Sequence, residues 1–596
     1  MSHYLTKSNF KLGLECKQKL KYYKAEYPSN LQDNSMLKFF AEGGFMVEAV
    51  AHAVMREKNP SVEFEVSLEH ERYKARVDAW EMFDEEIVLT EIKSKSLDSG
   101  DPDQFLKKNR KEVLSKHRQI LLDITFQVMV ARHCFPSHYI RPQLCIVNKN
   151  KQTGVEAIYE KIELLEVDLT KSNQPRAKFT GDSKALAADH FLEFIDVGDA
   201  VNILMDEVVF SSKDLLDFLK GAQDYKPLIA PKPCKQCEYR DAALRPNGFD
   251  ECWGLPRISP HIIDLYQGYG SNEQKRIVTE MIDKRDFKLI NLPVEAYNTG
   301  ESYAAPRRNQ VQVARSGKEF QDPLLITKLS EFTFPLHFID FEVSRIPVPY
   351  LPGMKPYEQV AFQFSCHTLD SQDSNELKHT EWLNLDDVYP NEQFIAQLRK
   401  AIGETGTVLV WSHYEASTLK SVRQQLIELD RANDSLLMWF RGLVGAEGAK
   451  SDAQTRIVDM LKISQEFYCH PSMNGSHSIK RVLDAIWSGA SFLWSDPWFS
   501  QYYLAVAENS PIDPYKTLGE GSQTLGLDET ADEEGADAPG VTDGVGAMRA
   551  YQSLLYGDRR GDESYRTQLA EAMLRYCALD TAAMVMIWRY WLTPRT

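Results

Sequence analysis

Residues 337–343, HFIDFEV, place two carboxylates inside an apolar stretch with the pattern of a buried strand. Because side chains alternate between the two faces of a strand, Asp340 and Glu342 point to one face, and Ile339 and Phe341 point to the other. Two like charges at that separation repel each other. The stretch therefore predicts a sheet with a buried strand and a positive charge between the two carboxylates.

The chain is too long for one ordinary core. Its 596 residues predict roughly two to four domains. With 43% apolar and 26% charged residues, the composition is that of a folded soluble protein. No apolar run is long enough for a membrane span, and the N-terminus does not have the pattern of a signal peptide. We therefore expect a cytoplasmic protein that does not enter a membrane.

Two separate α/β patterns follow each other along the chain. Helical periodicity covers residues 8–58, three strands are expected within 62–96, and a further strand-and-helix pattern begins at residue 335. A strand-rich beginning followed by alternating strands and helices predicts a mixed sheet covered by helices. The expected fold class is α/β, with an N-terminal domain at 1–255, a helical connector at 256–334 and a C-terminal domain at 335–596.

The net charge of −17 is unfavourable for binding nucleic acid, because phosphate neutralisation dominates that affinity. The distribution of charge along the chain makes the net charge a weaker argument against nucleic-acid binding. Residues 519–545 carry eight Asp or Glu residues without Lys or Arg, and we expect this acidic insert to be disordered. Residues 107–118, KKNRKEVLSKHR, are predicted as a basic helical run that forms either a solvated face or a binding surface.

A first group of polar residues lies within and after the expected hairpin of residues 76–96. Glu91 and Lys93 share a face by strand alternation, and a hairpin can bring Asp78 beside them. Two carboxylates can hold Mg²⁺, and a neighbouring lysine can stabilise a hydroxide or a pentavalent phosphate. Gln127 follows on the next expected helix. The alternative is an exposed hairpin on which these charges lie together by chance.

The cysteines suggest a metal or cluster site. Cys234 and Cys237 form a C-x-x-C turn, Cys252 follows, and Cys16 completes a set of four if the fold returns it to the others. Four thiolates bind either Zn²⁺ or an iron-sulfur cluster, and spacing alone does not distinguish them. For the C-x-x-C pair, ordinary buried cysteines are the alternative.

Residues 1–255 resemble the Cas4/RecB-type branch of the PD-(D/E)XK nucleases. The resemblance implies that Asp78 and Glu91 bind metal, that Lys93 and Gln127 complete the catalytic set, and that the four cysteines hold a structural [4Fe-4S] cluster, with Zn²⁺ as the alternative. The longer spacing before Cys252 departs from that family. The family's upstream ligand corresponds to either Glu48 or His52.

A second group of acids complements Asp340 and Glu342. Glu415 follows an apolar strand at the start of a helix. Tyr576 and Asp580 are four residues apart, on one face of an apolar C-terminal helix. An acid in such a helix is costly unless it is ligated or paired. A two-metal site is the chemistry that such a carboxylate set supports; four unrelated acids are the alternative.

This order of residues is similar to that in the DnaQ-like DEDD exonucleases of RNase H-like fold, in the subtype with a final Tyr-x-x-x-Asp motif. That resemblance implies that Asp340, Glu342 and Asp580 hold Mg²⁺ or Mn²⁺, that Glu415 completes the set, and that Tyr576 orients the attacking water. Glu415 departs from the Asp usual in that superfamily. More extensively, residues 335–596 resemble bacterial proteins that carry domain of unknown function 2779.

Neighbouring residues leave some roles open. Asp459 is another apolar-flanked acid, and Gly475, His477 and Lys480 lie on a loop that enters a helix. These loop residues either contact substrate phosphates or form a helix cap with solvated side chains. Aromatic residues near the sites favour single-stranded substrates if they stack on bases, although core packing explains them equally well. The three considered are Tyr350, Tyr357 and Phe364.

Together these features predict a nuclease with two sites that hydrolyses phosphodiester bonds of DNA, with 3′-to-5′ exonuclease activity at the C-terminal site. Its expected partner is DNA, single-stranded or with a free end, together with a separate helicase or defence protein, since the chain has no G-x-x-x-x-G-K-[ST] motif. The alternatives are a catalytically degenerate DNA-end-binding or adaptor protein and an RNA exonuclease.

Overall fold

A computed structural model describes the chain at residues 4–31, 35–165, 176–221, 231–241, 243–254, 260–446, 455–502, 512–518 and 541–593. The chain divides into two compact units. The first unit comprises residues 1–256 and 345–358, and the second comprises residues 257–344 and 359–596. The expected connector, 256–334, thus groups with the second unit except for its first residue.

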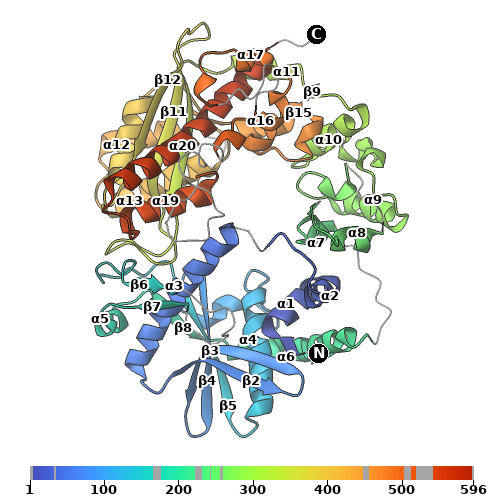
Figure 1. The fold of residues 1–596 in the computed structure, drawn as a ribbon, viewed down its shortest axis with the longest axis vertical. Helices are drawn as coiled ribbons and strands as arrows, with labels where there is room; N and C mark the ends of the chain where they lie inside the picture. Colours follow the sequence, from blue (N-terminus) through green and yellow to red (C-terminus); the bar gives the residue numbers. More distant parts are fainter. Residues whose placement is uncertain are drawn as a thin grey trace. The chain divides into compact units, whose positions relative to one another are not determined.

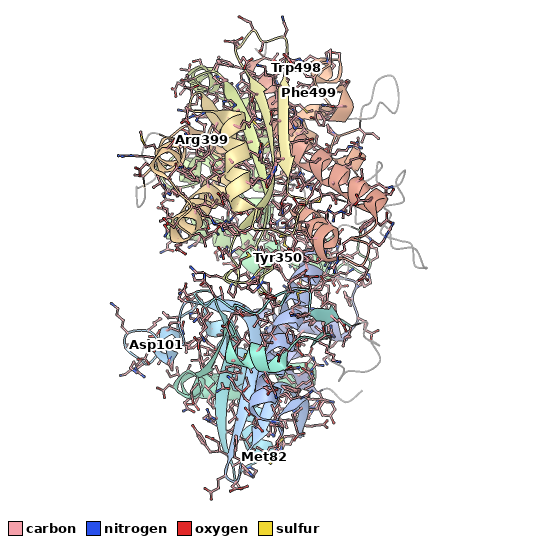
Figure 2. All side chains as sticks on the ribbon, turned by 90° about the vertical axis from the view of Figure 1, so that its left-hand side faces the viewer. Met82, Asp101, Tyr350, Arg399, Trp498 and Phe499 are labelled. Atoms are coloured by element: carbon pink, nitrogen blue, oxygen red, sulfur yellow. The ribbon has the colours of Figure 1, made fainter. Side chains whose placement is uncertain are left out.

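The first unit is built on a mixed six-stranded sheet. Its order is β1-β3-β4-β5-β8, with β2 paired to β3. Strands β2, β3 and β4 are successive antiparallel neighbours, as expected from residues 62–96, whereas β4 and β5 are parallel. Met82, at the tip of the β3–β4 hairpin, is half exposed (Figure 2). The strands are β1 (Leu5–Thr6), β2 (Glu63–His70), β3 (Tyr73–Met82), β4 (Glu86–Leu97), β5 (Tyr139–Asn148) and β8 (Leu192–Asp196).

Helices cover both faces of this sheet (Figure 1). Buried side chains of α1, α4 and α6 form the main core against one face, because these helices present apolar residues at helical spacing. A smaller cluster that includes Met55 of α3 and Val62 packs with Ala79 of the sheet. The principal helices are α1 (Lys7–Glu15), α2 (Lys17–Lys24), α3 (Ser35–Lys58), α4 (Arg118–Cys134) and α6 (Gly198–Leu219).

Shorter elements complete the first unit. A two-stranded sheet and one helix follow β5, and the late cysteines lie on two short helices and in the turn after the first of them. Gly248 begins α8, where a Cβ would lie 2.7 Å from the Tyr22 ring, so a side chain at this position would have to displace that ring. The elements are β6 (Ile162–Leu164), β7 (Ala177–Phe179), α5 (Ser183–Ala188), α7 (Pro231–Lys235) and α8 (Gly248–Trp253).

The second unit contains a mixed five-stranded sheet of order β12-β11-β10-β13-β14. Strand β11 is antiparallel to both β10 and β12, whereas β13 is parallel to both β10 and β14. This confirms the mixed α/β organisation expected from the sequence. The strands are β10 (Leu336–Ser344), β11 (Val360–Leu369), β12 (Lys378–Leu383), β13 (Thr407–Val410) and β14 (Ile457–Asp459).

Strand alternation in β10 separates an apolar face from a polar one. Ile339 and Phe341 belong to the core formed with α12, α13 and α14, where the Phe341 and Phe394 ring centroids are 5.0 Å apart. Helix α20 packs on β10 and β11 (Figure 1). These helices are α12 (Asn391–Ile402), α13 (Tyr414–Glu428), α14 (Asp434–Val444) and α20 (Glu563–Leu592).

The rest of the second unit is mainly helical. Residues 260–334 form short helices, in agreement with their expected helical character, and the region after β14 alternates helices with loops. The longer elements are α9 (Asn272–Asp283), α10 (Ala304–Ser316), α11 (Leu324–Ser330), α15 (Met460–Phe467), α16 (Ile479–Trp487) and α19 (Gly544–Tyr556). Strands β9 (Phe320–Gln321) and β15 (Tyr468–Cys469) form a two-stranded sheet.

The basic run at 107–118 is not a helix, so that prediction is wrong. Leu106 and Val113 form an isolated antiparallel bridge, and Arg110 adopts a positive φ of 53°. Exposed acids pair with the basic side chains, since Arg110 contacts Asp103 at 2.6 Å. Helix α4 begins only at Arg118. The local bridge therefore takes the place of the helix that the charge pattern suggested.

Two further expectations concern the acidic insert and membranes. Residues 519–540 lie outside the described residues, and α19 begins at Gly544 within the last part of the insert. None of the described helices combines the length and apolar character needed to span a membrane.

Candidate metal centres

The second unit brings two carboxylates and a thiol together at the centre of its sheet. Asp340 and Glu342 of β10 and Cys577 of α20 each have a ligand atom within 4.8 Å of those of the other two. The Cys577 thiol lies 3.5 Å from Oδ2 of Asp340, as donor. Because α20 covers the polar face of β10, residues more than 230 positions apart in sequence meet here. This cluster is a candidate centre for a divalent cation.

Asp340 of this cluster also lines a cavity of 460 Å³. Other residues singled out in the sequence line the same cavity, namely Glu415, His477, Lys480, Tyr576 and Asp580. Asp580 lies outside the 4.8 Å cluster among the described residues, but its charge acts on both Asp340 and Glu342. The structure thus brings the four predicted acids of the second unit into one electrostatic group.

Tyr515 is a site residue that the sequence analysis missed. Its hydroxyl donates to Oδ1 of Asp580 at 2.5 Å. The Lys480 ammonium lies 5.3 Å from the ring centroids of both Tyr515 and Tyr576, so it holds the two rings by cation–π interactions. No local sequence pattern identifies Tyr515, which follows α16 in the chain. The apolar context that identified Asp580 also surrounds Cys577 and could have pointed to it.

The preceding loop holds Lys480 at the cavity. His477 is buried, and its Nδ1 lies 2.9 Å from the Ser464 hydroxyl, while its carbonyl accepts from the Trp411 indole at 3.0 Å. Gly475 has φ 75°, and a Cβ there would lie 2.4 Å from the Asp264 carbonyl, so only glycine fits. His477 and Gly475 therefore support the loop, and Lys480 is the member that reaches the cluster.

Asp459 has a local partner. Its carboxylate accepts from the Leu461 amide at 3.0 Å and caps α15. It also acts electrostatically on Glu415, whose side chain accepts from the Ser412 hydroxyl at 3.4 Å. The structure therefore gives Asp459 a capping role beside the site.

Burial and mutual repulsion raise the pKa values of the acids in this group. Burial, followed by the charges of Asp580, Glu342 and Glu415, raises the pKa of Asp340 well above its ordinary value. Burial and Asp580 raise the pKa of Glu342 in the same way, with Lys480 opposing the shift. Without a bound cation, the cluster is stabilised by protonation. A divalent cation would remove that requirement.

These shifts predict a pH-dependent difference in stability between the wild type and Glu415→Gln. Burial raises the pKa of Glu415 to about 7 from 4.5. Between these values the folded state binds more protons than the unfolded state, so the wild type loses stability as pH rises, by about 3 kcal/mol across the interval. As pH rises from 4.5 to 7, we expect the free energy of unfolding of Glu415→Gln to rise relative to that of the chelator-treated wild type.

The comparison between the two proteins is needed because buried histidines act in the opposite direction. Burial lowers the pKa of both His337 and His477 to about 4, which adds stability to both proteins as pH rises. Denaturant unfolding at several pH values measures the difference. A difference that stays constant between pH 4.5 and 7 would contradict a raised pKa at Glu415.

The aromatic residues considered for base stacking are structural. Phe364 is fully buried against Phe394, and Tyr350 is buried with its ring 4.9 Å from that of Tyr159. The half-buried Tyr357 donates its hydroxyl hydrogen bond to the Ser94 carbonyl. The interpretation of these rings as a stacking surface is therefore wrong. Strand alternation explains Phe364, since it faces the apolar core opposite the acids.

The first unit assembles the other predicted group around Glu91. This carboxylate is fully buried in β4 and accepts hydrogen bonds from Lys93 and Gln127. Lys7 of α1 also contacts it, at 2.9 and 3.1 Å from its two oxygens. The β3–β4 hairpin brings Asp78 alongside, where its Oδ2 accepts from the Ile92 amide at 2.8 Å. The four predicted residues thus lie together, with Lys7 as an unpredicted cation.

The charges in this group shift the pKa values of Asp78 and Glu91 in opposite directions. Burial and the negative charge of Glu91 raise the pKa of Asp78 to about 7. Burial opposes ionisation of Glu91, but Lys7 and Lys93 outweigh it and hold the pKa of Glu91 well below its usual range. Although burial disfavours the Lys93 ammonium, Glu91 and Asp78 raise its pKa. Lys93 is therefore a permanent cation, suited to stabilising negative charge.

The structure distinguishes the two candidates for the upstream ligand. Burial, then the charges of Glu65 and Asp78, raises the pKa of Glu48 to about 7, which places this carboxylate in the electrostatic group. His52 packs against Phe64 in a tilted arrangement, with ring centroids 3.8 Å apart. Glu48 is thus the better candidate.

Helix α4 contributes a residue that the sequence analysis missed. Asp123 lies one turn before Gln127 and contacts Lys11 at 3.1 Å and Lys93 at 3.9 Å. Its burial in an apolar helix is the same signal that identified Asp580. Lys7, in contrast, belongs to no sequence pattern that would identify it as a site residue.

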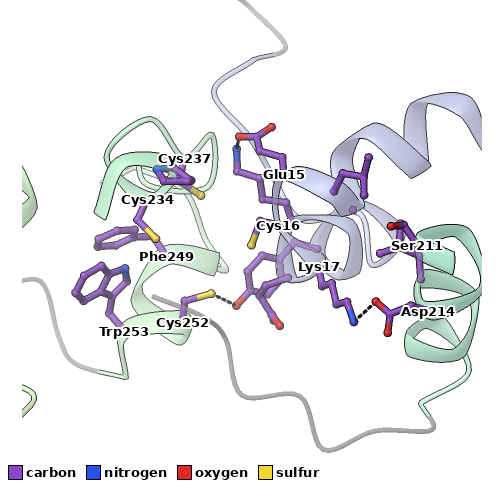
Figure 3. A pocket seen from close by; sticks show the side chains of 17 residues that line it. Glu15, Cys16, Lys17, Ser211, Asp214, Cys234, Cys237, Phe249, Cys252 and Trp253 are labelled. Atoms are coloured by element: carbon purple, nitrogen blue, oxygen red, sulfur yellow. Dashed lines mark hydrogen bonds and ion pairs between the residues drawn. The ribbon is translucent and has the colours of Figure 1, made fainter. Parts of the chain in front are cut away.

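The four predicted cysteines surround one cavity of 380 Å³ (Figure 3). Cys16 lies at the junction of α1 and α2, and Cys234, Cys237 and Cys252 come from α7, the turn after it and α8. Burial raises the pKa of Cys237 to about 12 and that of Cys252 to about 11. These two thiols are therefore protonated without a metal, and binding of a metal would release their protons.

These thiols are more widely spaced than the ligands of a single bound zinc ion. Among the described residues, no three of the four sulfurs lie within 4.8 Å of one another. A tetrahedral zinc site with Zn–S bonds of about 2.3 Å needs sulfurs roughly 3.8 Å apart. An iron-sulfur cluster, which bonds each cysteine through a different iron, spans a wider set. The donor set and its cavity fit such a cluster.

We expect the Cys237→Ser substitution to remove bound iron and inorganic sulfide from protein purified without oxygen. A cluster that joins α1 and α2 to α7 and α8 holds distant parts of the chain, so its loss should also lower the melting temperature. Iron, sulfide and visible absorbance measure the first effect. Cys134→Ser, a half-buried cysteine outside the cavity, is the control. Stoichiometric zinc with no iron in the wild type would contradict this expectation.

The two units thus define an α/β protein with buried carboxylate clusters suited to divalent cations. The chain carries the domain described as "Domain of unknown function (DUF2779)", whose family model matches residues 337–478. The matched segment contains Asp340, Glu342 and Glu415, whereas Cys577 and Asp580 lie beyond it. Comparisons with curated proteins and with solved structures found no match.

Proposed function

We propose that the protein is a metal-dependent nuclease that hydrolyses phosphodiester bonds of DNA at two sites. The second unit holds a 3′-to-5′ exonuclease site, and the first unit holds a PD-(D/E)XK-type site. The observation that carries this proposal is the placement of the half-buried Asp340 and the buried Glu342 on one face of β10, beside a cavity lined by Asp580, Glu415 and Lys480. Buried acids without a compensating cation are costly, and a two-metal nuclease uses such a set.

At the exonuclease site, Asp340, Glu342 and Asp580 would hold Mg²⁺ or Mn²⁺, and Glu415 would complete the acidic wall. Bound ions would supply an activated water and charge stabilisation for the leaving 3′ oxygen. Burial and the charges of these acids raise the pKa of Tyr576 well above its ordinary value, so its hydroxyl stays protonated and can orient the water. Lys480 keeps the Tyr576 ring in place and adds positive charge near the phosphate.

The topology of the second unit supports assignment of an RNase H-like exonuclease domain. Its mixed sheet is covered by helices, with the D-x-E pair on β10 and the Tyr-x-x-x-Asp pair on the covering helix α20. The DUF2779 match covers only the first part of this arrangement.

In the first unit, Asp78 and Glu91 would hold the metal, with Glu48 as a further carboxylate. Lys93 and Lys7 now neutralise Glu91, and a bound cation would take over part of that role. Lys93 would then be released to stabilise negative charge on the phosphate, while Gln127 fixes the Glu91 carboxylate. The four-cysteine cavity would hold a structural [4Fe-4S] cluster in the same unit.

The test uses the full-length protein with 3′-labelled single-stranded DNA, duplex DNA and RNA of the same sequence. We expect label to leave the DNA as mononucleotides with Mg²⁺ or Mn²⁺, and chelation to stop the release. Binding to DNA without cleavage under any of these conditions would instead identify an end-binding or adaptor protein. Release from RNA alone would overturn the assignment of the substrate.

A further inference from the structure

Cys577 belongs to the metal cluster by geometry, although no nuclease chemistry requires a thiol there. Its Sγ lies within 4.8 Å of a carboxylate oxygen of both Asp340 and Glu342. It lies 3.5 Å from Oδ2 of Asp340 and is fully buried. The position on α20, three residues before Asp580 and one after Tyr576, turns it toward the same strand. Two oxygen donors and one sulfur donor therefore face a common point.

The Glu342 carboxylate gives independent evidence that this point can bind a cation. Glu342 is only 7% exposed, and no hydrogen bond or ion pair from the described part of the chain reaches its oxygens. The Lys480 ammonium, which opposes the negative charge of the cluster, donates instead to the Thr542 carbonyl at 2.8 Å. An unpaired buried carboxylate is costly, so a bound cation is the partner that the geometry calls for.

The mixture of donors selects the kind of cation. Mg²⁺ takes oxygen ligands almost exclusively, whereas Zn²⁺ accepts both carboxylate oxygen and thiolate sulfur. In a tetrahedral zinc site, bonds of about 2.1 Å to oxygen and 2.3 Å to sulfur place the two donor atoms roughly 3.6 Å apart. The Asp340 to Cys577 separation of 3.5 Å matches that span. Three protein ligands would leave the fourth position open to water, as in catalytic zinc sites.

We propose that Asp340, Glu342 and Cys577 form a site for a thiophilic divalent cation, with Zn²⁺ as the physiological class and Cd²⁺ as its analogue. On binding, the S–H bond of Cys577 breaks, its proton passes to solvent, and a metal–sulfur bond forms. Zn²⁺ thus binds more tightly than Mg²⁺ at one of the two metal positions. This inference deepens the proposed function, because it assigns the metal preference of the same carboxylate site.

The test is a Cd²⁺ titration of the full-length protein in the presence of Mg²⁺, followed by the ultraviolet thiolate-to-cadmium absorbance and by calorimetry. The wild type and Cys577→Ser are compared with Cys366→Ser, a fully buried thiol of β11 that lies 3.5 Å from the Thr368 hydroxyl. The four-cysteine cavity contributes equally in all three. We expect Cys577→Ser alone to lose one thiolate of absorbance and at least about tenfold in affinity for one Cd²⁺.

Asp340→Asn provides a second variant that leaves the thiol in place. It should lose the same absorbance increment, because the cation needs both kinds of donor. Equal Cd²⁺ affinity and absorbance in the wild type and Cys577→Ser would overturn the inference. An undiminished increment in Asp340→Asn would also overturn it, since the thiol would then bind cadmium alone.

Nucleotide release with Mg²⁺, measured on the same wild-type preparation, separates the two proposals. Cys577-dependent cadmium binding in a protein without nuclease activity retains the metal site and rejects the nuclease. Nuclease activity with cadmium binding independent of Cys577 rejects the thiol ligand and retains the nuclease.

Discussion

The Asp340→Asn substitution should reduce metal-dependent release of nucleotides from 3′ ends by at least about 10³-fold, because it removes a charged ligand from the centre of the cluster. Asparagine keeps the size of the side chain, so the packing of β10 against α20 is preserved. The negative charge that holds the cation is lost. Single-turnover rates with 3′-labelled DNA measure the effect separately from product release.

Asp370→Asn is the matched control for this substitution. Asp370 follows β11 on the surface and pairs with Lys378, so its replacement should leave the rate within a factor of about two. Circular dichroism of both variants checks their folding. If Asp340→Asn folds and retains the wild-type rate, the cluster around β10 is not the exonuclease site.

The Lys93→Met substitution should reduce cleavage at the first-unit site by about 10²- to 10³-fold, as expected for loss of a positioned charge at a reacting phosphate. Methionine retains most of the side-chain volume, but it carries no ammonium group. The measurement is made in the Asp340→Asn background, where the second site is inactive. Cleavage of circular single-stranded DNA and of linear duplex DNA then reports the first site alone.

Lys95→Met controls for loss of a lysine from the same strand. Lys95 is exposed on β4, and its ammonium contacts the Lys116 carbonyl at 2.5 Å. We expect this variant to cleave at the rate of its Asp340→Asn parent. Equal rates in the Lys93→Met and Lys95→Met proteins would exclude Lys93 from the chemistry.

Local patterns were sufficient to predict those parts of the sites that lie within one strand or hairpin. Strand alternation placed Asp340 and Glu342 on one face, and the hairpin pattern placed Asp78 beside Glu91. The structure shows both arrangements. Such predictions succeed because the period of a strand is fixed by backbone geometry.

Contacts between distant segments could not be predicted from the sequence. Lys7 reaches Glu91 across 84 residues, and Tyr515 reaches Asp580 from a segment without a recognisable motif. The basic run at 107–118 shows the opposite difficulty, because charge spacing suggested a helix where a local bridge forms. Phe364 shows that an aromatic side chain near a site can belong to the core on the opposite face of its strand.

The DUF2779 match ends before α20, so it covers only part of the proposed metal site. Asp340 and Glu342 lie within residues 337–478, but Cys577 of their cluster and Tyr576 and Asp580 of the cavity wall lie outside that segment. A fragment restricted to the matched residues would therefore lack half of the proposed metal ligands. The proposed metal site therefore extends beyond the matched segment to α20.

Crystals of the full-length protein soaked with Mn²⁺ and measured at the manganese absorption edge test the central claim most directly. The account predicts an anomalous peak within bonding distance of both Asp340 and Glu342, at the face of β10 covered by α20. Peaks elsewhere with no manganese at these two carboxylates, or a hydrogen-bonded side chain filling the space between them, would contradict it.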